Sequence, residues 1–108
     1  MTAEAFKQQL EAIRAEYRNA LPAKLAELDA SWKALASGAA EPGRMVDLLR
    51  ALHSMAGSAK TLGVSGVSEA AAAAELFLEP FSKRRKLPNS AQQAEFARLL
   101  DKLKNTAR

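Results

Sequence analysis

The chain of 108 residues is predicted to be all-α, an antiparallel up-down four-helix bundle with an additional N-terminal helix. β-branched residues are few while alanine and leucine are abundant, which favours helix over strand. Apolar residues recur at intervals of three and four, and glycine and proline occur at a few places that divide the chain into helical segments. The connections between these segments are short, so consecutive helices are expected to be antiparallel. Residues 1–108 are expected to form one domain.

Two helices are expected before residue 38. Thr2 is expected to cap a first helix that runs to about Asn19, with an inner face of Phe6, Leu10, Ile13 and Tyr17. Pro22 lacks an N–H group and disfavours helical geometry at Leu21, so a break or kink is expected there. Because proline is favoured in the first turn of a helix, a second helix is expected to begin here, with an inner face of Leu25, Leu28, Trp32 and Leu35. Ser37 and Gly38 close it, and residues 39–43 form a loop.

A third helix is predicted from about Arg44 to Thr61, and Gly63 ends it in a C-cap position. Its apolar residues fall on one stripe, which consists of Met45, Leu48, Leu49, Leu52, Met55, Ala56, Ala59 and Leu62. The next helix is expected to begin at Ser65 or Gly66 and to kink or stop early near Pro80. Its inner face is predicted to be Val67, Ala70, Ala71, Ala74, Phe77 (or Leu78) and Phe81.

A basic loop over residues 82–88 is expected to lead into the last helix. The pattern Ser90-x-x-Gln93 is typical of a capping box, so Ser90 is the expected N-cap. The inner face of this helix is predicted to be Ala94, Phe96 (or Ala97), Leu99, Leu100 and Leu103.

Composition excludes several classes of protein. The chain has no cysteine, so it has no disulfides, and its first residues lack the apolar run of a signal peptide. No segment approaches the ~18 apolar residues that span a bilayer. We therefore expect a soluble cytoplasmic protein with no membrane partner. The net charge of +4 is spread over the helices apart from residues 83–86, and aromatic residues are few, which favours acidic protein partners over nucleic acid.

His53 is the only histidine of the chain, and its position indicates a function. On the predicted helix it lies about 110° from the centre of the apolar stripe, so one edge of its ring faces solvent. Gly57, one turn further, removes a side chain that would crowd the ring, although glycine inside a helix costs roughly 1 kcal/mol. Lys60, two turns further, adds a positive charge. This arrangement suits a nucleophilic or phosphate-bearing imidazole that a partner must reach.

Other chemistries are disfavoured. Without a second histidine or a cysteine, a zinc site is not expected. Ser54 and Asp47 point away from His53 on the helix, so they do not form a Ser–His–Asp arrangement with it. No glycine-rich phosphate loop is present, so the chain is not expected to bind ATP or to phosphorylate itself. We expect a chain without a cofactor of its own that is not an enzyme by itself.

The pattern His53-x-x-x-Gly57-Ser58-x-x-x-x-Gly63 resembles the signature of histidine-containing phosphotransfer (Hpt) domains, the intermediates of multistep His–Asp phosphorelays. Residues 21–28 are similar to the entry of the second helix in that family. The resemblance extends from about Phe6 to about Leu100. One departure is that the family often has a lysine three residues after the histidine, where this chain has Ala56.

The resemblance implies that His53 accepts a phosphoryl group from the aspartate of one receiver domain and passes it to another response regulator. The partner would supply both the aspartate and Mg²⁺. Family members often hold the second ring nitrogen with Glu or Gln twenty-two residues after the histidine, which here is Glu75; Glu69 or a water are alternatives. Lys60 is expected to supply the positive charge that family members often carry at the position of Ala56. The alternative is that Lys60 is an ordinary surface lysine.

The expected docking face lies around His53. It consists of Val46, Leu49, Arg50, Gly57, Lys60 and the segment 65–69, within which Ser65 and Glu69 are the expected contact residues. The expected partners are receiver domains of response regulators and of a hybrid histidine kinase, bound by a stand-alone monomer. Two alternatives remain open: a phosphoacceptor domain cut from a larger histidine kinase, and a helical interaction module that never carries phosphate. The sequence identifies neither the donating kinase nor the accepting regulator.

Overall fold

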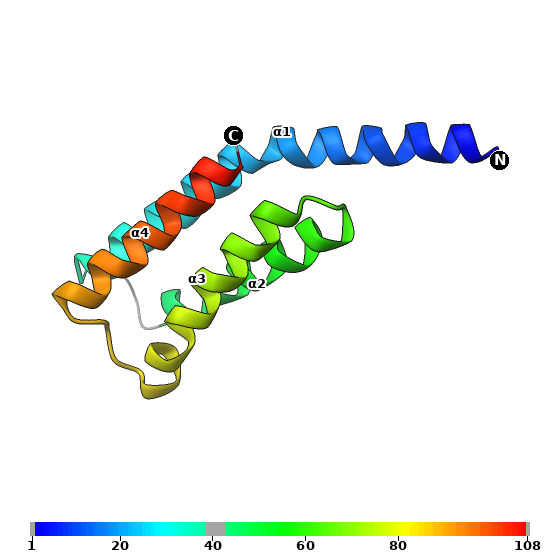
Figure 1. Ribbon diagram of the computed structural model, residues 1–108. Helices are drawn as coiled ribbons and strands as arrows, with labels where there is room; N and C mark the ends of the chain where they lie inside the picture. Colours follow the sequence, from blue (N-terminus) through cyan, green and yellow to red (C-terminus); the bar gives the residue numbers. More distant parts are fainter. Residues whose placement is uncertain (1, 39–42, 108) are drawn as a thin grey trace.

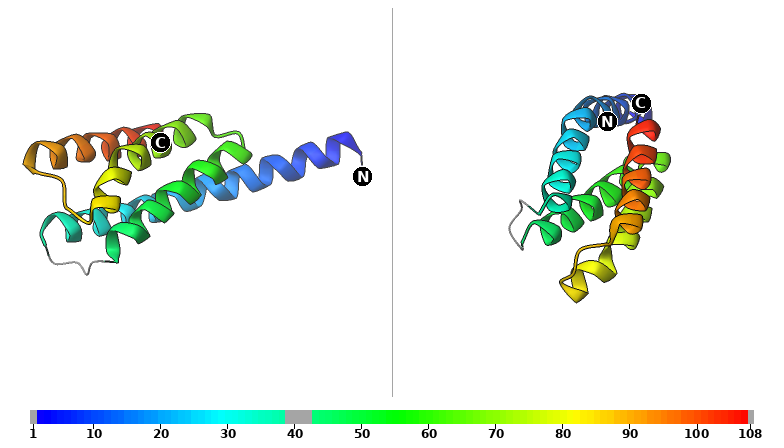
Figure 2. Two further views of the ribbon diagram at one scale, coloured as in Figure 1. Left: turned by 90° about the horizontal axis from the view of Figure 1, so that it is seen from below. Right: turned by 90° about the vertical axis from the view of Figure 1, so that its left-hand side faces the viewer.

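A computed structural model describes residues 2–38 and 43–107, which form four helices and no strand. They are α1 (Ala3–Ala36), α2 (Arg44–Thr61), α3 (Ser65–Arg84) and α4 (Ser90–Thr106). Successive helices run in alternating directions, and Figure 2 shows the four packed around one another. The predicted all-α up-down bundle is therefore correct. Apart from Gly43, the loop expected over residues 39–43 lies outside the described residues.

The first helix differs from the prediction, because α1 is one continuous helix of 34 residues and no separate N-terminal helix precedes it. Thr2 is its N-cap, as expected, and the Oγ1 atom of Thr2 accepts a hydrogen bond of 3.1 Å from the N–H of Ala5. Pro22 lies inside the helix and is exposed. Arg18, whose carbonyl loses its helical partner at Pro22, is also exposed, so water can satisfy it. Figure 1 shows α1 changing direction in its light-blue stretch, which is a kink and not a break.

The first turns of α1 project beyond the other helices (Figure 1), in a molecule that measures 53 × 23 × 20 Å. Phe6 and Ile13 were expected to face inward, but they are 60% and 49% exposed. Leu10 is half-buried, and only Tyr17 of the predicted stripe is buried. The prediction failed because no other helix extends beside the projecting turns. Arg14 marks where contact begins, since its Nε donates a hydrogen bond of 2.6 Å to the carbonyl of Leu62.

The core combines the second half of α1 with the apolar stripes of the other three helices. Its large, fully buried side chains are Leu21, Leu48, Leu52, Val67, Leu78, Phe96 and Leu103. The ring of Trp32 on α1 lies 4.4 Å from that of Phe96 on α4, centroid to centroid. α2 and α3 face each other with small residues, Ala59 on α2 and Ala70, Ala71 and Ala74 on α3, so their backbones pack closely.

The last residue of α2 follows the prediction, but its cap does not. α2 ends at Thr61; its C-cap is Leu62 where Gly63 was expected, and Gly63 follows with the left-handed φ of 77° that glycine tolerates best. The N–H of Val64 donates to the carbonyl of Ala59 at 2.7 Å, and the N–H of Gly63 donates to that of Lys60 at 3.2 Å, which is the Schellman pattern. The turn between α2 and α3 is therefore tightly defined.

The end of α3 and the start of α4 differ from the predictions. α3 continues past Pro80 to Arg84, so the early stop is wrong; Leu76, whose carbonyl loses its partner at Pro80, is 72% exposed to water. Residues 82–84, which were expected to begin the basic loop, are helical as a result. The capping box of α4 joins Asn89 and Gln92, and not Ser90 and Gln93.

The capping box is shifted by one residue because Asn89 has the extended backbone of an N-cap and Ser90 is already helical, and the side chain of Gln93 donates instead to the carbonyl of Pro88 at 2.8 Å. Of the inner face predicted for α4, Phe96, Leu100 and Leu103 are buried, Leu99 is half-buried and Ala94 is exposed. On α3, Leu78 is buried whereas Phe77 and Phe81 are half-buried. Among the helices that the structure describes, none is long and apolar enough to cross a membrane.

Candidate functional site

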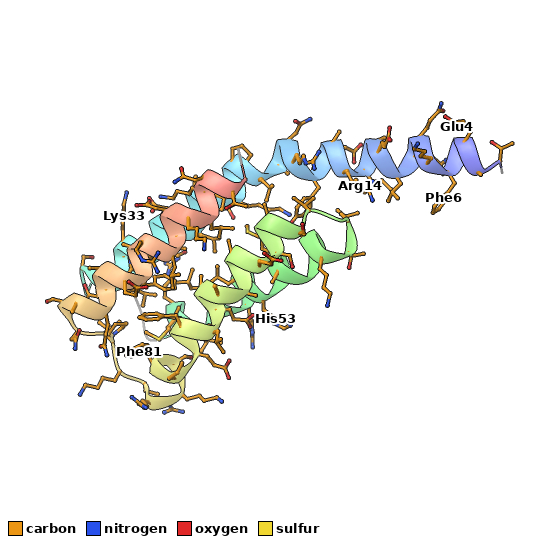
Figure 3. All side chains as sticks on the ribbon, in the orientation of Figure 1. Glu4, Phe6, Arg14, Lys33, His53 and Phe81 are labelled. Carbon is orange, nitrogen blue, oxygen red and sulfur yellow. The ribbon has the colours of Figure 1, made fainter. Side chains whose placement is uncertain are left out.

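His53 lies in the middle of α2 with 79% of its side chain exposed. Figure 3 shows it reaching out beyond the ribbons of α2 and α3. Its Nδ1 atom is 2.9 Å from Oε2 of Glu75, which is carried by α3 and has only 24% of its side chain exposed. The two helices are antiparallel neighbours, so residues that are far apart in the sequence lie level with each other.

The contact with Glu75 defines the chemistry of the ring. A carboxylate is an acceptor, so a hydrogen bond at this distance holds a proton on Nδ1 of His53. In the neutral ring the lone pair is then on Nε2, the atom that points away from Glu75. The arrangement therefore offers one nucleophilic nitrogen, and a carboxylate that offsets positive charge developing on the ring.

A groove of about 560 Å³ lies beside His53, between α2 and α3. It is lined by His53, Ala56, Gly57, Lys60, Ser65, Ser68, Glu69, Ala72 and Glu75. A more open depression continues along α2, lined by His53, Ser54, Gly57, Ser58, Thr61 and Leu62. Gly57 borders both hollows, and a Cβ atom added to it would have no neighbour within 4 Å. A partner can therefore approach His53 over Gly57 without obstruction.

The groove brings together most of the site residues expected from the sequence. His53, Gly57 and Lys60 come from α2, and Ser65, Glu69 and Glu75 come from α3. Lys60 lies at the far end, because seven residues span about 10 Å of helix.

Val46, Leu49 and Arg50 do not line the groove. They lie on earlier turns of α2, where Val46 is 43% exposed, Arg50 is exposed and Leu49 is half-buried. Val46 and Arg50 nevertheless share the outer face of α2 with His53. In the part of the chain that the structure describes, no group of three or more His, Asp or Glu residues could hold a metal ion.

Two side-chain hydrogen bonds that the sequence did not predict hold the turn of α2 between His53 and Gly57. The hydroxyl of Tyr17 on α1 donates to the carbonyl of Met55 at 3.2 Å, and that of Ser68 on α3 donates to the carbonyl of Ala56 at 2.7 Å. Burial raises the pKa of Tyr17, so its hydroxyl remains a donor. No local pattern predicts these bonds, because each joins different helices.

Ala72 is a groove residue that the sequence-based prediction of the site did not include, although the sequence holds a signal for it. In an antiparallel pair of helices the residue numbers of level positions have a nearly constant sum. With Glu75 opposite His53, Ala72 comes opposite Ala56, and both line the groove.

A family model described as the Hpt domain matches residues 2–106, nearly the whole chain. Neither a curated protein nor a solved structure showed significant similarity to the chain.

Proposed function

Because the chain belongs to the Hpt domain family, whose members carry phosphoryl groups on histidine in His–Asp phosphorelays, we propose that His53 is its phosphoacceptor. The observation that carries the proposal is the ring of the only histidine, exposed at the surface with Nδ1 bonded to Glu75. Nε2 is left free to react. We assign the role of orienting the ring to Glu75.

In the proposed reaction, the lone pair of Nε2 attacks the phosphorus of an aspartyl phosphate in a receiver domain. The N–P bond forms as the bond between phosphorus and the aspartate oxygen breaks, and the aspartate leaves as a carboxylate with that electron pair. Nδ1 keeps its proton, and the carboxylate of Glu75 offsets the positive charge on the ring. In the return step the aspartate of a second receiver attacks phosphorus, and Nε2 leaves with its lone pair restored.

The partner supplies the rest of the chemistry in this proposal. Hpt domains interact with receiver domains and have no kinase activity of their own. The Mg²⁺ that offsets the charge of the phosphoryl group is assigned to the receiver, beside its aspartate. The chain itself would act without a cofactor, as a monomer of one domain. Its partners would be receivers of response regulators and of a hybrid histidine kinase.

The docking surface is proposed to centre on His53 and Gly57. Gly57 leaves room for the receiver, and Lys60 and Arg50 attract its acidic site. The same surface includes Val46, Leu49, Ser65 and Glu69. Binding is expected to be weak and steered by charge, since a relay intermediate must release each partner.

A panel of purified, ³²P-phosphorylated receiver domains tests the proposal. At least one receiver should transfer its label to the wild-type protein, and the label should be acid-labile and base-stable, as phosphohistidine is. His53→Gln should acquire none. Label that remains on His53→Gln, or no transfer to the wild type from any receiver, would contradict the proposed function.

A further inference from the structure

The groove beside His53 is hollow because its floor is made of small residues. Ala56 and Gly57 contribute the floor on the α2 side, and Ala72 contributes it on the α3 side. The larger lining residues stand toward the two ends, with His53 and Glu75 at one end and Lys60 and Glu69 at the other. Between these ends the lining is alanine and glycine together with Ser68, whose hydroxyl is already bound to the carbonyl of Ala56, so the hollow offers a largely apolar surface between polar ends.

A partner that reacts with His53 must cover this groove. The proposed function requires a receiver to bring phosphorus within bonding distance of Nε2. A specific protein interface covers about 800 Å² on each partner, which corresponds to a disc about 16 Å in radius. The groove extends only about 10 Å from His53 toward Lys60. A receiver centred on His53 therefore closes the groove along its whole length.

A closed groove with an apolar floor favours a partner that fills it, because an empty hollow loses dispersion contacts and traps water on carbon. We propose that the receiver inserts an apolar side chain over Ala56, Gly57 and Ala72, and that Ala72 is therefore a specificity-determining residue. The inference rests on the proposed function and adds to it the chemistry of the partner's contact. The size of residue 72 sets the size of the side chain that the groove accepts.

The test compares Ala72→Leu with Ala73→Leu. Both alanines are exposed neighbours on α3, and their side chains point about 100° apart, so only Ala72 lines the groove. Leucine is a good helix former, so both variants should melt within a few degrees of the wild type. With the receiver that labels the wild type fastest, we expect Ala72→Leu to slow transfer about tenfold or more. Ala73→Leu should slow it less than about twofold.

Two further measurements separate docking from chemistry. Phosphoramidate, a small donor that gives its phosphoryl group to histidine with loss of ammonia, should label Ala72→Leu at the wild-type rate, because it does not need the groove. Ala72→Ser, which keeps residue 72 small, should lose much less of the receiver-dependent transfer rate than Ala72→Leu does.

Three results would overturn the inference. The first is that Ala72→Leu accepts phosphate from the receiver as fast as Ala73→Leu does. The second is an equal loss with the receiver and with phosphoramidate, which would mean that leucine disturbs His53 itself. The third, a wild type that phosphoramidate labels but no receiver does, would refute the proposed function together with the inference.

Discussion

The Nδ1 atom of His53 lies 2.9 Å from Oε2 of Glu75, a contact that joins α2 to α3 between residues 22 positions apart. If this carboxylate orients the ring, Glu75→Ala should slow phosphoryl acceptance about tenfold or more, and Glu75→Gln less, because the amide oxygen can still accept a bond from Nδ1. Transfer of label from a receiver measures the rate, and ¹⁵N NMR of the imidazole reports which nitrogen carries the proton.

The control for Glu75 is Glu79→Gln, one turn further along α3. Glu79 is half-buried and pairs with Lys83 at 3.0 Å. If Glu79→Gln and Glu75→Gln slow phosphoryl transfer by the same factor, the loss of negative charge and not the contact with the ring is responsible.

Replacement of His53 should separate function from stability. The side chain is 79% exposed, so His53→Gln should change the melting temperature by no more than a few degrees. Phosphoryl acceptance should fall to zero, because the chain has no other histidine. Circular dichroism and transfer of label test the two halves of this prediction, and a variant that unfolds would show that His53 has a structural role.

Gly57 should lower the stability of α2 but leave room for the receiver to reach His53. The glycine is helical and, apart from the adjoining residues and backbone of α2 itself, no atom lies within 4 Å of the position that a Cβ would take. Gly57→Leu should therefore gain up to ~1 kcal/mol of unfolding free energy. The same leucine stands where the receiver must approach His53, so transfer should slow. Urea unfolding and transfer of label provide the measurements. A stabilised variant that transfers at the wild-type rate would mean that the glycine serves no access role.

Lys60 should act through electrostatic attraction. Lys60→Glu reverses one charge at the far end of the groove, so it should weaken receiver binding and slow transfer. The defect should shrink as salt is raised, since the Debye length is about 8 Å at physiological ionic strength. Transfer rates measured over a range of salt concentrations test this.

The matched control for Lys60 is Lys102→Glu, at an exposed position of α4. Lys104 is unsuitable, because its Nζ atom pairs with Asp29 at 2.7 Å. If Lys60→Glu and Lys102→Glu slow transfer by the same factor, only the net charge of the protein matters.

Asp29 should make stability depend on acid pH. Hydrogen bonds from Lys104 and then from Lys33 hold the pKa of Asp29 below its ordinary value of 3.8. The folded protein therefore binds this proton less readily than the unfolded chain, so the stabilisation is fully present above about pH 4 and is lost as pH falls through the folded pKa. Asp29→Asn should cost about 0.5–1 kcal/mol at pH 7. Urea unfolding should show that the substitution lowers the free energy of unfolding less at pH 3 than at pH 7. An equal loss at both pH values would refute the role given to Asp29.

Local pattern was sufficient for much of this protein. The bounds of α2 follow from its apolar stripe and from Gly63, whose left-handed conformation ends the helix. The placement of His53, Gly57 and Lys60 on one outer face of α2 also follows from the helical period alone. These features depend on residues within a turn or two of one another, which is the range over which a single sequence carries a readable signal.

Tertiary structure decided the rest. Whether Pro22 breaks or only bends α1 depends on water satisfying the carbonyl of Arg18, an exposed residue. Whether Phe6 is buried depends on a neighbouring helix that does not extend so far. The bonds from Tyr17 and Ser68 to the turn after His53, and the place of Ala72 in the floor of the groove, exist only where separate helices meet. Periodicity tells which face of a helix is apolar, but it does not tell which partner covers that face or at what register, because those are set by packing among residues far apart in the chain.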